Sequence, residues 1–311
     1  MDDNRPNFFI IGHPKCGTTS LWRWMGRQPQ VRMSRLKEPH FFCADLHRAS
    51  DRFHGRSLFF PVRNHRQYHA LFTGPRCRVL GDASPCYLFS AEAVRRILAY
   101  NPDARFLVLL RHPIRFLHSF HAQLVAGGQE TLLDLPEALA AEPRRRAGKD
   151  VPPTAICPQM LWYTEWLRFD MMLDRLFAQA DPTAIKVIVF EELVACPERI
   201  LTDLARWLGI PKVRMIPLPR ENSSGSEPLL GTVVRRLFPP KIQRAVKRLF
   251  PLGLDTEVWL GARSGLKRLS RRQRTLRRHD AEVRRMLRPL LVEVVANTED
   301  LLGRRITAWA A

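Results

Sequence analysis

Residues 7–25, NFFIIGHPKCGTTSLWRWM, limit the folds open to this chain more than any other stretch of its sequence. The apolar run at residues 8–11 indicates a strand buried on both faces of a parallel sheet. A glycine-bounded loop, residues 12–17, follows, and a helix begins at Thr18. This order aims backbone N–H groups and the positive end of a helix dipole at one point. The stretch therefore predicts an α/β fold with an anion site, most often one for phosphate.

The position of its lysine separates this loop from that of nucleoside triphosphatases, G-x-x-x-x-G-K-[ST]. Gly12 and Gly17 have that spacing, but Thr18 stands where the lysine should, and the lysine comes earlier, at Lys15. Residues 14–21, PKCGTTSL, resemble the phosphosulfate loop of sulfotransferases, which use 3′-phosphoadenosine 5′-phosphosulfate (PAPS). A generic anion loop and a degenerate triphosphatase are the alternatives. The resemblance implies that the donor is bound by Lys15, Cys16, Gly17, Thr18, Thr19 and Ser20.

A second motif follows the most clearly buried strand of the chain, residues 104–110 (ARFLVLL). The strand ends at Arg111, and open α/β sheets bind ligands at the carboxyl ends of their strands. A guanidinium offers a fork of donors that suits phosphate. Arg111, with Ser119 eight residues later, resembles the signature by which sulfotransferases bind the 3′-phosphate of PAPS. Alone, an arginine capping a strand end and a serine in a helix would need no ligand, but here both motifs occur in order.

The candidate general base lies in residues 35–42, RLKEPHFF. In an extended segment Glu38 and His40 face the same way, although so short a string is by itself typical of a surface Lys–Glu pair. It resembles the K-E-x-x-F-F and E-x-H-F-F strings of carbohydrate sulfotransferases. The resemblance implies that Glu38 is the base and that His40 hydrogen-bonds Glu38 or the acceptor. Two family residues are replaced: Cys43 stands in place of an aspartate, and Ala83 in place of a lysine that contacts the sulfuryl group or the acceptor. We expect another basic residue to supply that contact.

The resemblance covers most of residues 7–210 and implies a three-layer α/β domain of P-loop type with a central parallel sheet. Three strand–loop–helix units found independently favour the same fold. We expect a single domain over residues 1–311, with a mobile insertion or lid at residues 127–153. The expected helices include residues 91–100 with Ser90 as N-cap, 159–180, 197–208 and 287–302. Residues 78–88 are expected to form a strand that ends in a loop, and residues 185–190 a further strand. A family loop near Arg220, Ser223 and Gly225 implies that these three residues contact the 3′-phosphate.

The chain is strongly basic, with a formal charge of +20 and a pI of about 10.8. Residues 231–311 hold 19 Lys and Arg against 7 Asp and Glu, and residues 230–290 are predicted to form a basic helical extension within the domain. A solvated basic face is the commonest use of such helices; peripheral contact with an anionic membrane is the alternative that we retain, and no nucleic-acid partner is expected. A polar N-terminus and the lack of a membrane-spanning apolar stretch predict a cytoplasmic location.

Together these features predict transfer of a sulfuryl group from PAPS to a hydroxyl or amine of an acceptor. The glutamate base favours a carbohydrate or glycolipid, and the basic surface suits an acceptor that carries acidic groups. No metal is expected, because Lys15 supplies the charge that magnesium supplies in triphosphatases, and the six cysteines show no C-x-x-C pair. The alternatives are a P-loop nucleotide kinase or triphosphatase, with Asp82 as its only candidate magnesium-binding carboxylate, and a non-catalytic basic protein that binds anions.

Overall fold

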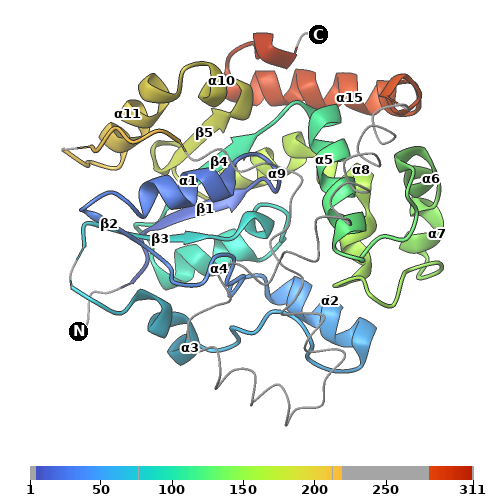
Figure 1. Cartoon of the computed structure of the whole chain (residues 1–311), viewed down its shortest axis with the longest axis horizontal. Coiled ribbons are helices and arrows are strands. Elements are labelled where there is room, and N and C mark those ends of the chain that lie inside the picture. The colour runs from blue at the N-terminus through green and yellow to red at the C-terminus, as the bar shows by residue number, and fades with distance from the viewer. Residues whose placement is uncertain (1–4, 76, 212, 219–279, 310–311) are drawn as a thin grey trace, which may run out of the picture.

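A computed structural model describes residues 5–75, 77–211, 213–218 and 280–309. Its centre is a five-stranded sheet in the order β2-β3-β1-β4-β5, and every neighbouring pair is parallel (Figure 1). This confirms the predicted α/β fold with a parallel sheet. The strands are β1 (Phe8–Gly12), β2 (Val31–Met33), β3 (Val79–Ala83), β4 (Arg105–Leu110) and β5 (Ile185–Val189).

Helices cover both faces of this sheet. All residues of β1 and β3 are buried, as are all but the first of β4. Because successive residues of a strand point to opposite faces, both faces must be shielded from water. The α-helices are α1 (Thr18–Met25), α2 (Ala44–His54), α3 (His65–His69), α4 (Ala93–Tyr100), α5 (Pro113–Ala126), α6 (Leu135–Ala140), α7 (Glu142–Arg146), α8 (Tyr163–Leu167), α9 (Phe169–Phe177), α10 (Phe190–Ala195), α11 (Pro197–Trp207) and α15 (Asp280–Leu302). Short 3₁₀ helices are η1 (Ala70–Phe72), η2 (Pro85–Tyr87), η3 (Pro158–Leu161), η4 (Pro182–Ala184) and η6 (Thr307–Trp309).

The strand order creates a crevice at the carboxyl ends of β1 and β4. These two strands are neighbours, but the chain leaves β1 towards β2 on one side of the sheet and leaves β4 towards β5 on the other. The loops that follow them therefore diverge and leave a depression between them, which is where open α/β sheets bind ligands. Both predicted anion-binding motifs follow these two strands.

Some expected elements differ from the structure. Strand β2 was not predicted, because three residues are too few to show a period. The single helix expected over residues 159–180 is wrong: the chain turns at Trp162 and Arg168, with ψ of 73° and 60°, and forms η3, α8 and α9 instead. Neither turn has the glycine or proline that would signal a break. Helix α4 begins at Ala93, two residues later than expected, and its N-cap is Glu92 and not Ser90. The Ser90 hydroxyl still accepts a hydrogen bond from the backbone N–H of Ala93, at 3.1 Å.

Residues 127–153, expected to be a mobile lid, are instead tied down by a buried ion pair. Both terminal nitrogens of Arg145 donate to the Glu130 carboxylate, at 2.6 and 2.8 Å, and the Tyr163 hydroxyl donates to it at 2.8 Å. Burial would raise the pKa of Glu130, but these donors outweigh it and hold the pKa below its usual value. Breaking a buried pair leaves an uncompensated charge, so this segment, which includes α6 and α7, is fixed to α8.

Helix α15 is the last α-helix in the described part of the chain, before the short η6. It begins at Asp280, earlier than expected, and packs beside α9 and α5 (Figure 1). An ion pair of 2.9 Å between Arg168 and Glu293 helps to attach it. Most of the predicted basic extension, together with Arg220, Ser223 and Gly225, lies outside the described residues. Among the helices that the structure describes, none combines the length and apolar character needed to cross a bilayer.

Candidate functional site

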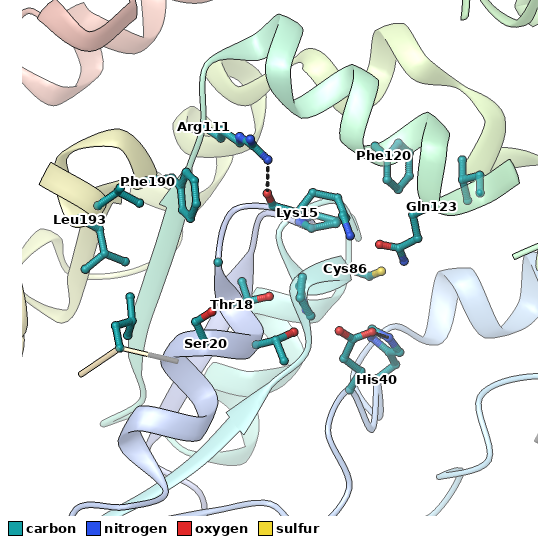
Figure 2. Close-up of a pocket in the computed structure, with 18 of the residues that line it drawn as sticks. Lys15, Thr18, Ser20, His40, Cys86, Arg111, Phe120, Gln123, Phe190 and Leu193 are labelled. Atoms are coloured by element: carbon teal, nitrogen blue, oxygen red, sulfur yellow. Dashed lines mark hydrogen bonds and ion pairs between the residues drawn. The ribbon is translucent and has the colours of Figure 1, made fainter. Parts of the chain in front are cut away.

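A cavity of about 890 Å³ opens at the crevice between β1 and β4. Lys15 lies at its centre (Figure 2). One part, here called the Arg111 end, is lined by Arg111, Phe190 and Leu193, from the segments that follow β4 and β5. The opposite part, the His40 end, is lined by side chains from several loops and from α5. Figure 2 shows His40, Cys86, Phe120 and Gln123 there, and this end is taken to include the cavity-lining residues that adjoin them in sequence or through contacts: Glu38, Phe59, Phe60, Pro61, Pro85, Leu124, Gln129, Ile156 and Met160.

The loop between β1 and α1 presents the start of a helix to this cavity. Gly17 has φ of 90°, and a Cβ on it would lie 2.9 Å from the Phe190 ring, so any side chain there would clash. No side chain caps α1, and its first turn holds no acidic residue. The orphan N–H groups of a helix start attract an anion. The predicted residues Lys15, Gly17, Thr18, Thr19 and Ser20 all line the cavity.

Cys16 is the exception within this loop. It is fully buried, its thiol donates to the Pro14 carbonyl at 3.3 Å, and its backbone N–H donates to the His13 carbonyl. Burial raises the pKa of the Cys16 thiol well above its usual value. This predicted residue therefore packs into the core and does not line the cavity that the described residues form.

Arg111 is held in place by the same loop. Its Nη1 donates to the carbonyl of Lys15 at 3.2 Å, and its guanidinium carbon lies 5.0 Å from the centre of the Phe190 ring (Figure 2). The two predicted motifs, 96 residues apart, thus meet at one point. Ser119 does not join them: it lies on α5, partly exposed, and is not part of the cavity lining formed by the described residues.

Glu38 and His40 face one another across 3.5 Å between carboxylate Oε2 and ring Nε2. The reason differs from the one expected. The segment is not extended, because Glu38 and His40 have φ of 61° and 52°, and two left-handed residues bring the side chains together. The ammonium of Lys37 contacts the other carboxylate oxygen of Glu38. Burial would raise the pKa of Glu38, but Lys37 and His40 outweigh it and hold the pKa well below its usual value.

A buried hydrogen-bond network fixes His40. Its backbone N–H donates to the Ser84 hydroxyl at 3.0 Å, and Ser84 in turn donates to Asp82 at 2.7 Å. The hydroxyls of Tyr68 and Tyr87 also donate to Asp82, both at 2.8 Å. The Asp82 carboxylate is fully buried and holds three hydroxyls. It therefore serves this network and is not placed as a magnesium ligand of a kinase.

Strained backbone is concentrated around the cavity. Among the described residues other than glycine, five have positive φ, and four of them line it: Lys15, Glu38, His40 and Phe60. Such conformations cost roughly 1–3 kcal/mol each and cluster at functional sites, where the surrounding structure enforces them. The described residues contain no group of three or more His, Cys, Asp or Glu side chains able to hold a metal ion.

Three residues of the site were given no functional role by the sequence. Lys37 stood inside the recognised string, where its contact with Glu38 could be taken for a surface pair. Phe190 directly follows a buried strand, and that position was its only signal. Gln123 lies on α5, and nothing in its neighbourhood distinguishes it from a solvated helical residue.

Comparison with known proteins gives consistent matches. A family model described as "Sulfotransferase family" matches residues 6–214. Human carbohydrate sulfotransferase 15 is 27% identical over 150 residues, covering 37% of this chain and 26% of that protein. Human heparan sulfate glucosamine 3-O-sulfotransferase 6 is 32% identical over 124 residues, covering 39% of this chain and 31% of that protein. The chain thus aligns with between a quarter and a third of the length of these relatives.

A solved structure, that of a sulfotransferase from Alicyclobacillus acidocaldarius, has the same fold. It superimposes with a TM-score of 0.64 at 24% identity, and the alignment covers 99% of each chain.

Proposed function

The chain belongs to the sulfotransferase family, and we propose that it transfers a sulfuryl group from PAPS to a hydroxyl or amine of an acceptor, a carbohydrate or glycolipid. One observation carries this proposal. A single cavity holds two cationic side chains, Lys15 and Arg111, near the start of a helix, and an ionised carboxylate, Glu38, at its opposite end. The cavity can therefore bind an anionic donor at its cationic side chains and place an acceptor beside a carboxylate that can accept its proton.

The described residues suit the donor. Burial lowers the pKa of Lys15, and Arg111 and Lys37 lower it further, while Glu38 opposes them. A cation whose charge is disfavoured in this way gains when an anion binds beside it. The Arg111 guanidinium can donate a pair of hydrogen bonds to the 3′-phosphate of the donor. The adjacent Phe190 ring offers an apolar face to the adenine ring of the donor. Lys15 and the N–H groups at the start of α1 would hold the phosphosulfate.

The reaction divides between the two ends. PAPS supplies a sulfuryl group on a phosphate leaving group. Glu38 accepts the proton of the acceptor hydroxyl or amine as the new bond to sulfur forms and the bond to the phosphate oxygen breaks. Lys15 and the N–H groups of Gly17 and Thr18 hold the negative charge that remains on the phosphate, and preorganised donors of this kind usually contribute most to catalysis. His40, 3.5 Å from Glu38, keeps the carboxylate oriented.

We propose that Lys37 compensates for the positive charge of the family lysine that is absent at Ala83, acting through Glu38 and not by lining the cavity. Ala83 is fully buried in β3, and its carbonyl accepts the backbone N–H of Glu38 at 3.1 Å. The loop that starts at Ser34 therefore runs directly over the end of this strand. Lys37 lies on that loop, mostly buried, with its ammonium on Glu38. A positive charge thus reaches the carboxylate from the loop and not from the strand.

Lys37→Met is expected to shift the acid side of the pH–rate profile upwards. The base must be deprotonated, so activity falls as the pH drops through the pKa of Glu38. With Lys37 present, that pKa is depressed, and the wild type should keep its kcat/KM down to about pH 4, the ordinary value of a glutamate. Loss of an adjacent opposite charge should raise the pKa by about 1–3 units. The measurement is kcat/KM against pH. Lys37→Arg should retain the wild-type profile, and equal profiles for all three proteins would contradict the role of Lys37.

Chelation is expected to leave activity unchanged, because we assign the stabilisation of phosphate charge to Lys15. The measurement compares initial rates of sulfuryl transfer before and after dialysis against EDTA, with and without added magnesium. Activity that disappears in EDTA and returns with magnesium would contradict the proposal and support the kinase alternative.

A further inference from the structure

The His40 end of the cavity is mostly apolar. Beside Glu38 and His40 it presents an apolar wall whose members come from three separate segments, and two amides, Gln123 and Gln129, are its other polar side chains. The apolar wall consists of Phe59, Phe60, Phe120, Leu124, Ile156 and Met160.

Among the described residues that line this end, none is a lysine or an arginine; Lys37, which is not part of the lining, directs its ammonium at Glu38. The described lysine and arginine that do line the cavity are Lys15, at its centre, and Arg111, at the far end. An acceptor rich in sulfate or carboxylate would call for arginine or lysine beside it. Thus the chain is strongly basic, but the described lining of the His40 end is not.

The apolar wall is held rigidly. Phe60 has φ of 56°, its ring lies edge-on to His40 at 5.7 Å between centroids, and it stacks on His47 at 4.8 Å. Arg63, a nearby cation, donates to the carbonyls of both Phe59 and Phe60, at 2.7 and 2.6 Å, and forms an ion pair with Asp51 at 2.9 Å. Its charge is therefore directed at the backbone behind the wall. Phe60, with its strained backbone and its contact with His40, therefore belongs to the site.

We propose that the acceptor is an amphipathic alcohol, with its reactive hydroxyl next to an uncharged alkyl or aryl group that packs against the apolar wall. This rests on the proposed function and narrows it: of the carbohydrate and glycolipid acceptors, the apolar wall favours a glycolipid. Pockets of this size bury most of a small ligand on apolar side chains and orient it with a few polar groups. Here Glu38 and His40 would meet the hydroxyl, and Phe59, Phe60 and Ile156 the apolar group.

The test measures binding, so that it does not depend on finding the natural acceptor. The protein is saturated with 3′-phosphoadenosine 5′-phosphate and titrated calorimetrically with methyl, hexyl and octyl β-glucosides and with a heparan sulfate octasaccharide. Each methylene buried against the wall should tighten binding about threefold to fourfold until the wall is covered. Affinity should therefore rise steeply from the methyl to the octyl glucoside, and the octasaccharide should bind more weakly than the octyl glucoside.

Two variants and one control locate the effect. Phe59→Ser and Ile156→Thr change half-buried wall residues. Each should reduce the rise in affinity with chain length, so that the octyl glucoside binds at least tenfold more weakly than it binds to the wild type. Leu58→Ser is the matched control: Leu58 is 37% exposed, precedes Phe59 and does not line the cavity, and its substitution should preserve the dependence. Retained binding of the bisphosphate nucleotide and a wild-type melting temperature show that each variant is folded.

The outcomes separate the two proposals. If the nucleotide binds but affinity does not rise with chain length, or the octasaccharide binds more tightly, the inference about the acceptor is wrong and the proposed function stands. The same holds if Leu58→Ser flattens the series as much as Phe59→Ser does. If the bisphosphate nucleotide itself fails to bind to the wild type, the proposed function is wrong, and the inference falls with it.

Discussion

Glu38→Gln should reduce kcat by about 10²- to 10⁴-fold, the contribution typical of a positioned general base. The substitution keeps the shape of the side chain and a carbonyl oxygen towards Lys37, but an amide cannot accept the acceptor's proton. Binding of the nucleotide should not weaken, because the change removes a negative charge that lies in the same cavity as Lys15. Single-turnover transfer from radiolabelled PAPS, with nucleotide affinity measured in parallel, distinguishes loss of chemistry from loss of binding.

A matched control is available in Glu92. This glutamate also pairs with a cation, Arg48, but it lies at the start of α4 and does not line the cavity that the described residues form. Glu92→Gln should leave kcat within about twofold, since surface ion pairs contribute little. A Glu38→Gln enzyme with activity close to that of the wild type would mean that Glu38 is not the base, and His40 would be the next residue to test.

Lys15→Ala and Arg111→Ala should each weaken binding of 3′-phosphoadenosine 5′-phosphate by about 10- to 100-fold, as expected for removing a hydrogen-bonded charge from a shielded site. Arg111→Lys should lie between wild type and alanine, because an ammonium keeps the charge but loses the fork. Isothermal titration against ATP–magnesium provides the comparison. Wild-type protein should prefer the bisphosphate nucleotide.

The Lys15 and Arg111 variants also test the remaining alternatives. A wild-type preference for ATP–magnesium would contradict the donor assignment and favour a kinase. Equal binding in wild type and both variants would mean that the anion is held elsewhere, as a non-catalytic basic surface would hold it. Such binding would also fall steeply with salt.

The sequence predicted the parts of this site that depend on local geometry. A strand, a glycine-bounded loop and a helix place Lys15 and Thr18 wherever the rest of the chain goes, and the same holds for Arg111 at the end of β4. Position 17 needs a glycine for two reasons: its φ is positive, and the Phe190 ring leaves no room for a Cβ. The sequence motif indicates the first reason but not the second. The positions of Lys15, Thr18 and Arg111 at the cavity were therefore predictable from short strings, whereas Cys16 and Ser119, predicted in the same way, do not line it.

The remaining parts depend on contacts between distant residues, which a single sequence does not display. The left-handed conformations of Glu38 and His40 are enforced by the strand end at Ala83 and by Ser84. The role of Asp82 follows from the hydroxyls of Tyr68 on α3, Tyr87 on η2 and Ser84 between β3 and η2. The net charge of the chain suggested an acidic acceptor, but a net charge does not show where the charged side chains lie. The apolar wall shows that the His40 end of the cavity differs from the chain as a whole.

The two ends of the cavity are formed by different kinds of backbone segment. Arg111 and Phe190 directly follow strands of the sheet, and Lys15 lies three residues after the end of β1. Phe59 and Ile156 instead lie in irregular segments that pair with no strand. Changes at residues 59–61 or 156–160 can therefore accumulate without disturbing strand register or the loop around Lys15. Evolution, or an engineer who randomises these residues, can thus change the acceptor end of the cavity while the strand ends and the loop around Lys15 stay the same.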